Sequence, residues 1–323
     1  MKKILHTAKY TGLPLEILKG ACPEGFIVKT LDEPTHEQLV KEAIDADYFL
    51  VSGRLRIDKE VLNNAPRLRM IQRTGVGTEM LDLDAIKSRS LPVYVNRGVN
   101  AQSVAEHTIT LILACLKRLP QVNRQTHQGV WKKQQTGVTT RELKGKKVAL
   151  VGMGNIGRLV AKMLQAFDAK VIYTDVIRQA PETEQRLGLT YYDSFESMLP
   201  MADILSFHCP LTPENTNILN SCTLALMKKG AIVVNTARGK LINPGDLYES
   251  LTAGLLSAAA LDTHYEEPIQ DGYQLSELDN VIMTPHIGGL SYEAFHSMIV
   301  GAMNNISTFD KGLFESIAHA KFI

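Results

Sequence analysis

Short apolar runs alternate with amphipathic segments over the first hundred residues. The apolar runs predict buried strands at residues 4–5, 26–28, 48–51, 70–71 and 93–95. Between them, apolar residues recur with the period of a helix near residues 37–44, 58–64 and 82–87. Strands that alternate with helices are typical of a parallel sheet with helices on its faces. This part of the chain is therefore expected to form an α/β unit of its own.

A second series of apolar runs begins near residue 148. These runs predict strands at residues 148–151, 171–174, 204–207, 232–235, 257–261 and 281–283. The best marked of the intervening helices covers residues 244–251. Six or more strands with crossover helices match a doubly wound sheet, which binds its ligand at the carboxyl ends of the strands. A last amphipathic helix, residues 292–309, has no strand after it and is expected to return to the first unit.

The segment between the two series combines an apolar helix with a polar stretch. Asn100 is a suitable N-cap for a helix over residues 100–119, and residues 109–116 are almost wholly apolar. A helix that is apolar all round is buried between layers or against another subunit. Residues 121–146 are polar without a clear period, yet they include the only tryptophan, Trp131. We interpret them as an arm rather than a linker, because tryptophan is costly to leave in water.

Composition narrows the class of partner. The 323 residues suggest about two domains, and 35 Lys and Arg balance 34 Asp and Glu, so no net field favours nucleic acid or an anionic membrane. A small molecule is the expected partner. No run approaches the ~18 apolar residues of a membrane helix, and the amino-terminal apolar run is too short for a secretory signal. A soluble, cytoplasmic protein is therefore expected. The cysteines lack C-x-x-C spacing, so they are expected to be reduced thiols and no structural metal is indicated. They are Cys22, Cys115, Cys209 and Cys222.

Residues 147–175 carry the pattern of a dinucleotide-binding turn. Gly152, Gly154 and Gly157 follow a predicted strand and open an amphipathic helix, so that backbone can approach a pyrophosphate at the helix N-terminus. A glycine turn alone is weak evidence, but the flanking strand and helix agree with it. Asp175 ends the next strand, where a carboxylate accepts hydrogen bonds from a ribose 2′-hydroxyl. NAD is therefore favoured, although Arg178 nearby leaves NADP open.

Three further segments follow strands of the second series and hold residues able to assist a hydride transfer. Arg238 can bind a carboxylate through two hydrogen bonds, and His286 can exchange a proton near neutral pH. An acidic loop offers Glu266 and Glu267, either of which could stabilise the protonated imidazole and orient its ring. Each residue also has a plain structural explanation, namely a surface ion pair, a solvated loop or a packed histidine. Their shared position at one sheet edge favours the catalytic interpretation.

These motifs together resemble the NAD-dependent D-isomer-specific 2-hydroxyacid dehydrogenases, nearest to the phosphoglycerate dehydrogenase branch without a C-terminal regulatory domain. The resemblance extends over nearly the whole chain. Its motifs are residues 73–77, 100–106, the glycine turn, 208–212, 235–239, 260–262 with 266–268, and 285–289.

The resemblance implies a Rossmann domain of residues 100–289 inserted into a flavodoxin-like substrate domain of residues 1–99 and 290–323. It assigns catalysis to Arg238, Glu267 and His286, and Glu267 is chosen over Glu266 because the family's glutamate lies five residues beyond the aspartate, here Asp262. Val76, Gly77 and Arg238 would bind the substrate carboxylate. The implied coenzyme contacts are Gly152, Gly154, Asn155, Ile156, Gly157, Asp175, Cys209, Pro210, Thr216, Thr236, Ala237, Arg238, Asp262, His286 and Gly288.

The resemblance also implies a homodimer packed through the coenzyme domains and the arm, and closure of the two domains around the ligands. Two departures bear on the substrate. Ser52 stands where phosphoglycerate dehydrogenases have a phosphate-binding arginine, which puts 3-phosphoglycerate in doubt, although Arg54, two residues later, could compensate. Formate is disfavoured because His286 is matched with Glu267 rather than a glutamine. The alternative to an enzyme is an NAD(H)-sensing corepressor-like protein that shares this fold. His107 is expected to be a packing residue, and a substrate contact of His264 is left open.

Overall fold

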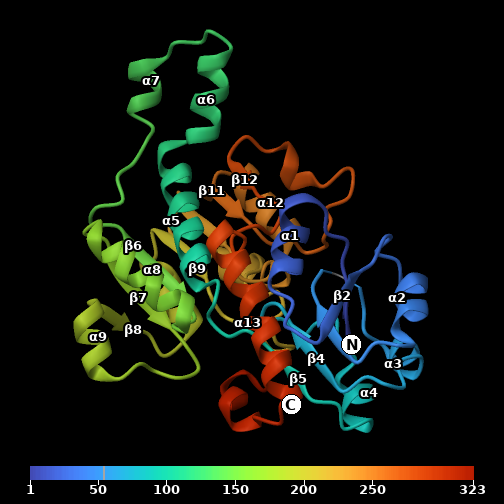
Figure 1. Cartoon of the computed structure of the whole chain (residues 1–323). Helices are drawn as coiled ribbons and strands as arrows, with labels where there is room; N and C mark the ends of the chain where they lie inside the picture. Colours follow the sequence, from blue (N-terminus) through green and yellow to red (C-terminus); the bar gives the residue numbers. More distant parts are fainter. Residues whose placement is uncertain (54) are drawn as a thin grey trace. The chain divides into compact units, whose positions relative to one another are not determined.

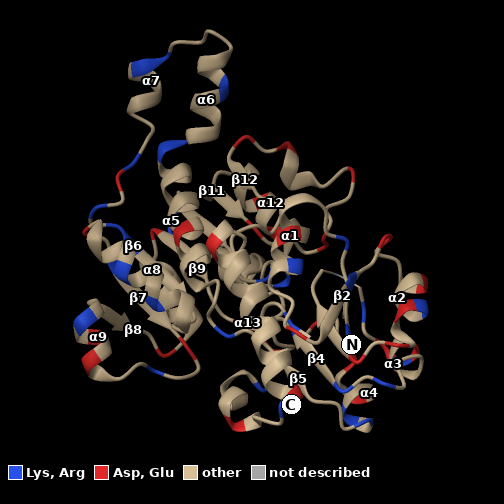
Figure 2. Cartoon of the chain, viewed as in Figure 1, with Lys and Arg blue, Asp and Glu red and all other residues tan. Residues whose placement is uncertain are grey.

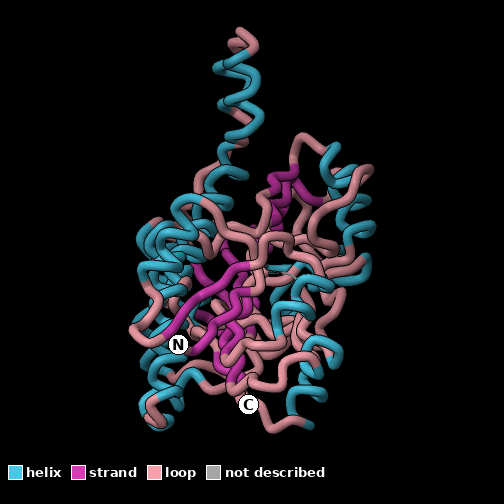
Figure 3. Tube along the Cα trace, turned by 45° about the vertical axis from the view of Figure 1, so that its right-hand side comes forward, coloured by secondary structure: helices cyan, strands magenta, loops and turns pink. Residues whose placement is uncertain are grey.

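The computed structural model describes residues 1–53 and 55–323, and it divides the chain into two compact units. Unit 1 comprises Met1–Asn100 and Tyr292–Ile323, and unit 2 comprises Ala101–Ser291. Each unit holds one parallel sheet with helices on both faces, so the predicted α/β fold class is confirmed (Figure 1). In Figure 3 the strands, in magenta, lie inside layers of cyan helices.

The sheet of unit 1 has the order β2-β1-β3-β4-β5, the order of flavodoxin-like folds. Its strands are β1 (Lys2–His6), β2 (Phe26–Thr30), β3 (Tyr48–Val51), β4 (Met70–Arg73) and β5 (Val93–Tyr94). One face packs against α2 (His36–Ala43), α3 (Lys59–Asn63) and α4 (Leu83–Ser88). The other packs against α1 (Gly12–Gly20), α13 (Tyr292–Asp310) and the 3-10 helix η4 (Phe314–Ala320). Neighbouring strand residues such as Ile4 and Leu5 belong to opposite cores, as the strand period of two requires.

The sheet of unit 2 has the order β12-β11-β10-β9-β6-β7-β8. Its strands are β6 (Lys147–Val151), β7 (Lys170–Thr174), β8 (Leu189–Tyr191), β9 (Ile204–Phe207), β10 (Ala231–Asn235), β11 (Leu256–Leu261) and β12 (Val281–Met283). One core includes α5 (Ala101–Lys117) and α8 (Asn155–Ala166). The other includes α10 (Phe195–Met198), α11 (Ser221–Leu224) and α12 (Pro244–Thr252). Because all strands are parallel, their carboxyl ends share one edge of the sheet.

The arm predicted without regular structure contains two helices. α6 (Leu119–His127) and α7 (Lys133–Gly137) form the hairpin that projects from unit 2 in both views (Figures 1 and 3). Neither helix has a buried residue, and Trp131 in the turn between them is 80% exposed. Within this chain, therefore, the arm leaves its tryptophan in water.

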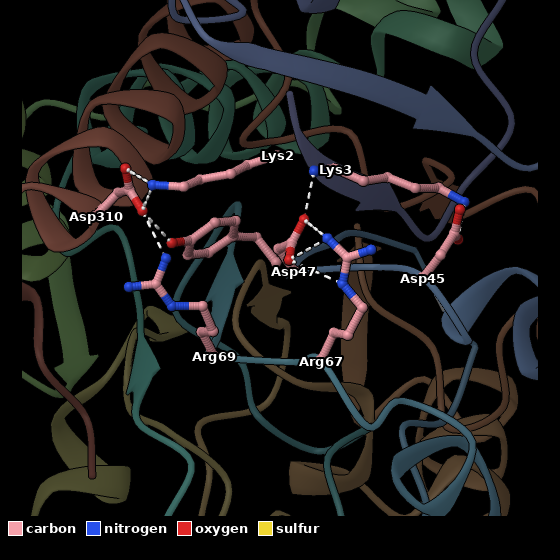
Figure 4. Close-up of polar contacts among 8 residues, drawn as sticks. Lys2, Lys3, Asp45, Asp47, Arg67, Arg69 and Asp310 are labelled. Atoms are coloured by element: carbon pink, nitrogen blue, oxygen red, sulfur yellow. Dashed lines mark hydrogen bonds and ion pairs between the residues drawn. The ribbon is translucent and has the colours of Figure 1, made fainter.

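The last helix of unit 1 is attached to its sheet by a charged cluster around Asp310 (Figure 4). Asp310 accepts hydrogen bonds from Lys2 Nζ at 2.5 Å, Tyr48 Oη at 2.7 Å and Arg69 Nη1 at 2.6 Å. Burial alone would raise the pKa of Asp310, but these three donors outweigh it and lower the pKa to about 2. The carboxylate thus connects the end of α13 to three strands, β1, β3 and β4 or their immediate flanks.

Along the ribbon, acidic and basic residues are interspersed in both units, while the hairpin of α6 and α7 carries basic residues only (Figure 2). All four cysteines, Cys22, Cys115, Cys209 and Cys222, are free thiols. Among the described helices, none combines the length and the apolar character needed to cross a bilayer.

Candidate active site

The glycine turn after β6 is built by close backbone contacts. Gly152 has φ +100°, and a Cβ there would lie 2.7 Å from the backbone of His208. A Cβ on Gly157 would lie 2.2 Å from Gly152 O, so both positions require glycine. Around Gly154, in contrast, nothing lies within 4 Å of the Cβ position. An open space therefore faces the first amides of α8, where a helix has no acceptors of its own and attracts a phosphate.

Asp175 connects the tip of β7 to this turn. One carboxylate oxygen accepts a hydrogen bond from Met153 N at 2.5 Å, and the other accepts one from Ile177 N at 3.1 Å. A carboxylate has about four lone-pair sites, so Asp175 can still accept hydrogen bonds from ribose hydroxyls. Its position suits the predicted contact with the adenosine ribose.

The end of β9, the strand beside β6 in the sheet, and the loop that follows it place uncharged residues next to the turn. Burial lowers the pKa of His208 to about 3, so its ring is neutral, and its Nε2 lies 2.9 Å from Ser206 Oγ. Burial raises the pKa of the Cys209 thiol to about 11, and the charge of Asp175 acts in the same direction. Pro210 and Thr216 are exposed in the loop that follows. These residues are available to the adenosine part of a dinucleotide without adding charge.

The segment after β10 is shaped by Asn235. Its side chain accepts from Ala237 N at 3.0 Å and donates to Arg238 O at 2.8 Å. Thr236 and Ala237 are buried, while Arg238 is half-buried and donates from Nη1 to Ala237 O at 2.7 Å. The turn therefore presents the Arg238 side chain at the carboxyl edge of the sheet.

Gly239 brings this segment against the acidic loop. A Cβ on Gly239 would lie 2.0 Å from the backbone of His264, so only glycine allows this approach. His264 N in turn donates to Glu267 Oε1 at 2.9 Å. The backbone of His264 therefore contacts both Gly239, the residue after Arg238, and the carboxylate of Glu267.

Glu267 and His286 form a hydrogen-bonded pair. Glu267 Oε2 lies 2.9 Å from His286 Nδ1, and the side chains are 19% and 45% exposed, respectively. Because a carboxylate only accepts hydrogen bonds, Nδ1 is the donor in this pair. The other ring nitrogen, Nε2, is therefore the atom that can take up or release a proton toward a ligand.

Asp262 holds the loop that carries His286. The buried carboxylate accepts from Ile287 N at 2.9 Å, Gly288 N at 2.8 Å and Thr284 Oγ1 at 2.6 Å. Burial alone would raise the pKa of Asp262, but hydrogen bonds from His107, Thr284 and the two amides lower it to about 2. The carboxylate is thus ionised and occupied by the chain's own donors, and its implied contact with the coenzyme stays a prediction.

Helix α5 contributes two polar residues that the sequence did not identify as part of the site. His107 Nε2 lies 3.1 Å from Thr284 Oγ1 and 3.4 Å from Asp262 Oδ1, and Ser103 Oγ donates to Gly288 O at 2.7 Å. The expected packing role of His107 was therefore incomplete. Its spacing of four residues from Ser103 put both on one face of the helix, which was the available signal.

Val76 and Gly77 lie in unit 1, in the loop after β4. Val76 is 48% exposed, and Gly77 O accepts from Arg73 Nε at 2.6 Å. Ser52, at the end of β3, is buried, and its Oγ lies 2.5 Å from His6 Nε2. Arg54, considered as a substitute phosphate ligand, lies outside the described residues.

A cavity of about 620 Å³ lies at the other end of the strands of unit 2. Its lining includes Ala231 and Ser257 near the amino ends of β10 and β11, together with Arg118 and Arg141 at the root of the arm. Since dinucleotides bind at carboxyl ends in doubly wound sheets, this cavity is separate from the candidate site.

Residues 109–288 match the family model described as D-isomer specific 2-hydroxyacid dehydrogenase, NAD binding domain. The chain is 35% identical over 301 residues to a glyoxylate reductase of Thermofilum pendens, covering 92% of this chain and 88% of the relative. It is 33% identical over 290 residues to a D-3-phosphoglycerate dehydrogenase of Archaeoglobus fulgidus, but spans only 54% of that relative's length.

Solved structures agree with these relatives. A D-lactate dehydrogenase from Aquifex aeolicus, complexed with NAD and lactic acid, has a TM-score of 0.85 and 27% sequence identity, with 99% of this chain and 98% of that chain covered. A glyoxylate reductase and a D-lactate dehydrogenase are both enzymes, so these comparisons give no support to the alternative of a corepressor-like protein.

Proposed function

Because the chain belongs to the D-isomer-specific 2-hydroxyacid dehydrogenases, which use NAD, we propose that Arg238, Glu267 and His286 catalyse its reaction. The reaction is a hydride transfer between NAD(H) and C2 of a D-2-hydroxy acid or the matching 2-keto acid. The observation that carries the assignment is the 2.9 Å pair of His286 Nδ1 and Glu267 Oε2 at the carboxyl edge of the coenzyme-binding sheet.

The coenzyme would be held by the glycine turn and the loops beside it. The open space at Gly154 supports a pyrophosphate there, with the amides of Asn155 and Ile156 as donors and Asp175 on the ribose. The remaining proposed contacts are Gly152, Gly157, Cys209, Pro210, Thr216, Thr236, Ala237, Asp262 and Gly288. Bound NADH supplies the hydride for reduction of a keto acid, and bound NAD accepts it in the reverse direction.

His286 would move the proton that accompanies the hydride. In reduction, Nε2 of the protonated ring donates to the carbonyl oxygen as negative charge develops there. In oxidation, the neutral ring takes the hydroxyl proton at the same atom. Glu267 stabilises the protonated ring and fixes its orientation through Nδ1 in both directions.

Arg238 would bind the substrate carboxylate through its guanidinium and polarise the neighbouring carbonyl group. The backbone amides of the loop at Val76 and Gly77 are proposed as further carboxylate donors, because a glycine-containing turn lets backbone approach an anion. These groups would set which carbon of the substrate meets the coenzyme.

The side chain on C2 is expected to be small and without phosphate. Ser52 supports this, because it is neutral, buried and hydrogen-bonded to His6 where the phosphoglycerate branch has an arginine. Relatives named glyoxylate reductase, 35% and 36% identical to this chain, also support an unphosphorylated substrate.

The test is NADH oxidation by the purified protein with a panel of 2-keto acids: glyoxylate, pyruvate, hydroxypyruvate and 3-phosphohydroxypyruvate. We expect turnover with at least one unphosphorylated acid. His286→Ala should lower kcat by about 10³-fold while NADH binding, followed by fluorescence, is retained. His296→Ala, on the exposed side of α13, is the matched control and should keep full activity. Tight NADH binding without oxidation by any acid would refute the enzyme assignment.

We also propose that the protein acts as a homodimer in the cytoplasm. The arm supports the dimer, because α6 and α7 bury no residue within the chain and Trp131 is 80% exposed. The four free thiols support a reducing compartment.

A further inference from the structure

We propose that Glu184 holds Arg178 away from the coenzyme and thereby makes the protein select NAD over NADP. Arg178 follows Asp175 in the loop at the tip of β7, beside the ribose position of the coenzyme. An arginine at this place usually accommodates the 2′-phosphate that distinguishes NADP from NAD. If Arg178 is bound to another side chain instead, the protein should favour NAD over NADP.

Arg178 is bound by two parallel hydrogen bonds. Its Nε donates to Glu184 Oε1 and its Nη2 donates to Glu184 Oε2, both at 2.9 Å. The guanidinium carbon also lies 5.0 Å from the centroid of the Tyr191 ring. Glu184 thus occupies the Nε–Nη2 edge of the guanidinium, one of the two edges that could bind a 2′-phosphate, and neutralises its charge.

Glu184 is itself held in place. The Tyr173 hydroxyl donates to Glu184 Oε1 at 2.6 Å and accepts a hydrogen bond from Gln179 N at 2.9 Å. The Glu184 side chain is only 13% exposed, on the short helix α9 (Pro181–Leu187). Because the Tyr173 hydroxyl on β7 fixes the Glu184 carboxylate, this carboxylate keeps its orientation better than that of an exposed glutamate. The position of Arg178 is therefore defined as well.

The consequence is that two features disfavour NADP together. Asp175 repels a 2′-phosphate, and Arg178, the nearby cation that could offset this repulsion, is neutralised by Glu184. The alternative is that the Arg178–Glu184 pair only stabilises α9, in which case its removal would change stability but not coenzyme preference.

The experiment measures NADPH and NADH affinity directly by calorimetry, so it does not depend on the proposed reaction or its substrate. Asp175→Asn provides the background, because asparagine removes the charge and keeps an oxygen for Met153 N. Adding Glu184→Ala should tighten NADPH binding about tenfold, the effect of one charge-assisted phosphate contact, and change NADH binding less than about threefold. Further addition of Arg178→Gln should abolish the gain.

Glu182→Ala, an exposed acid on the same helix, is the matched control and should give no gain. Glu184→Gln, which can still accept the Tyr173 hydroxyl, should give a smaller gain in the same direction if the alanine variant fails to fold. The proposal is overturned if a variant that binds NADH normally shows no gain for NADPH. It is equally overturned if the gain survives Arg178→Gln or appears equally for NADH.

Discussion

His286 has φ +59°, a left-handed conformation that is uncommon outside glycine, although asparagine, aspartate and histidine adopt it more often than other residues do. Such a residue costs on the order of 1 kcal/mol or more and persists only where its surroundings fix it. Here the following two amides, of Ile287 and Gly288, are both bound by the buried Asp262. In this conformation the imidazole is hydrogen-bonded to Glu267.

At the scale of single residues, the two adjacent glutamates should behave differently. Glu267→Gln keeps the shape of the side chain but removes the charge that stabilises the protonated His286, so kcat for 2-keto acid reduction should fall about 10²-fold. The exposed Glu266→Gln should retain wild-type kcat. Steady-state kinetics with NADH near saturation makes the comparison. Equal losses in both variants would contradict the assignment of Glu267.

The sequence predicted at which edge of the sheet the candidate residues lie, but not which residues they contact. Arg238, Glu267 and His286 each follow a strand run of the second unit, so parallel topology alone predicted their common edge. The bonds of His107 to Thr284 and Asp262 join positions more than 150 residues apart, and no local pattern encodes them. From the sequence alone, a histidine in a helix looks the same whether it only packs or also hydrogen-bonds to residues of the site.

At the scale of elements, apolar runs predicted most of the strands, and the expected limits of β9 and β12 agree with the structure. β8 was not predicted because its three residues, Leu-Thr-Tyr, do not form an apolar run. α1 was not predicted because Gly12 and Pro14 suggest a turn, but both lie in the first turn of the helix, where proline loses no hydrogen bond.

The attachment of α13 through Asp310 should make unit 1 sensitive to acid. Because the pKa of Asp310 is lowered to about 2 in the folded protein, its ionised form contributes stability above the ordinary carboxyl pKa, and this contribution is lost as pH falls toward 2. Asp310→Asn should lower the free energy of unfolding by about 1 kcal/mol at neutral pH. The difference from wild type should shrink as pH is lowered from about 5.

Urea unfolding followed by circular dichroism at several pH values measures this difference. Asp45→Asn is the matched control, because Asp45 pairs with Lys3 and not with the Asp310 cluster (Figure 4), its side chain is 60% exposed and such pairs contribute little. A loss in Asp310→Asn that is the same at every pH would show that packing, rather than charge, attaches α13.

At the scale of the whole molecule, the arm should decide the oligomeric state. Trp131→Glu places a charge at the most exposed aromatic residue of the hairpin, so the dimer should dissociate at least tenfold more readily in sedimentation equilibrium. Gln135→Glu on α7 introduces the same charge at another exposed position and should weaken the dimer less. A wild-type protein that stays monomeric at micromolar concentration would refute the dimer. NADH binding should be unchanged in both variants.

Unit 2 is a single continuous segment, and its two ends are tied together by the hydrogen bond from Ser291 N to Ser103 Oγ at 3.3 Å. The first and last residues of the dinucleotide-binding unit therefore lie close together. A segment with adjacent ends is suited to insertion into a surface loop of another protein, because it does not force the ends of that loop apart. It is equally suited to circular permutation, in which the two ends are joined and new termini are made in another loop.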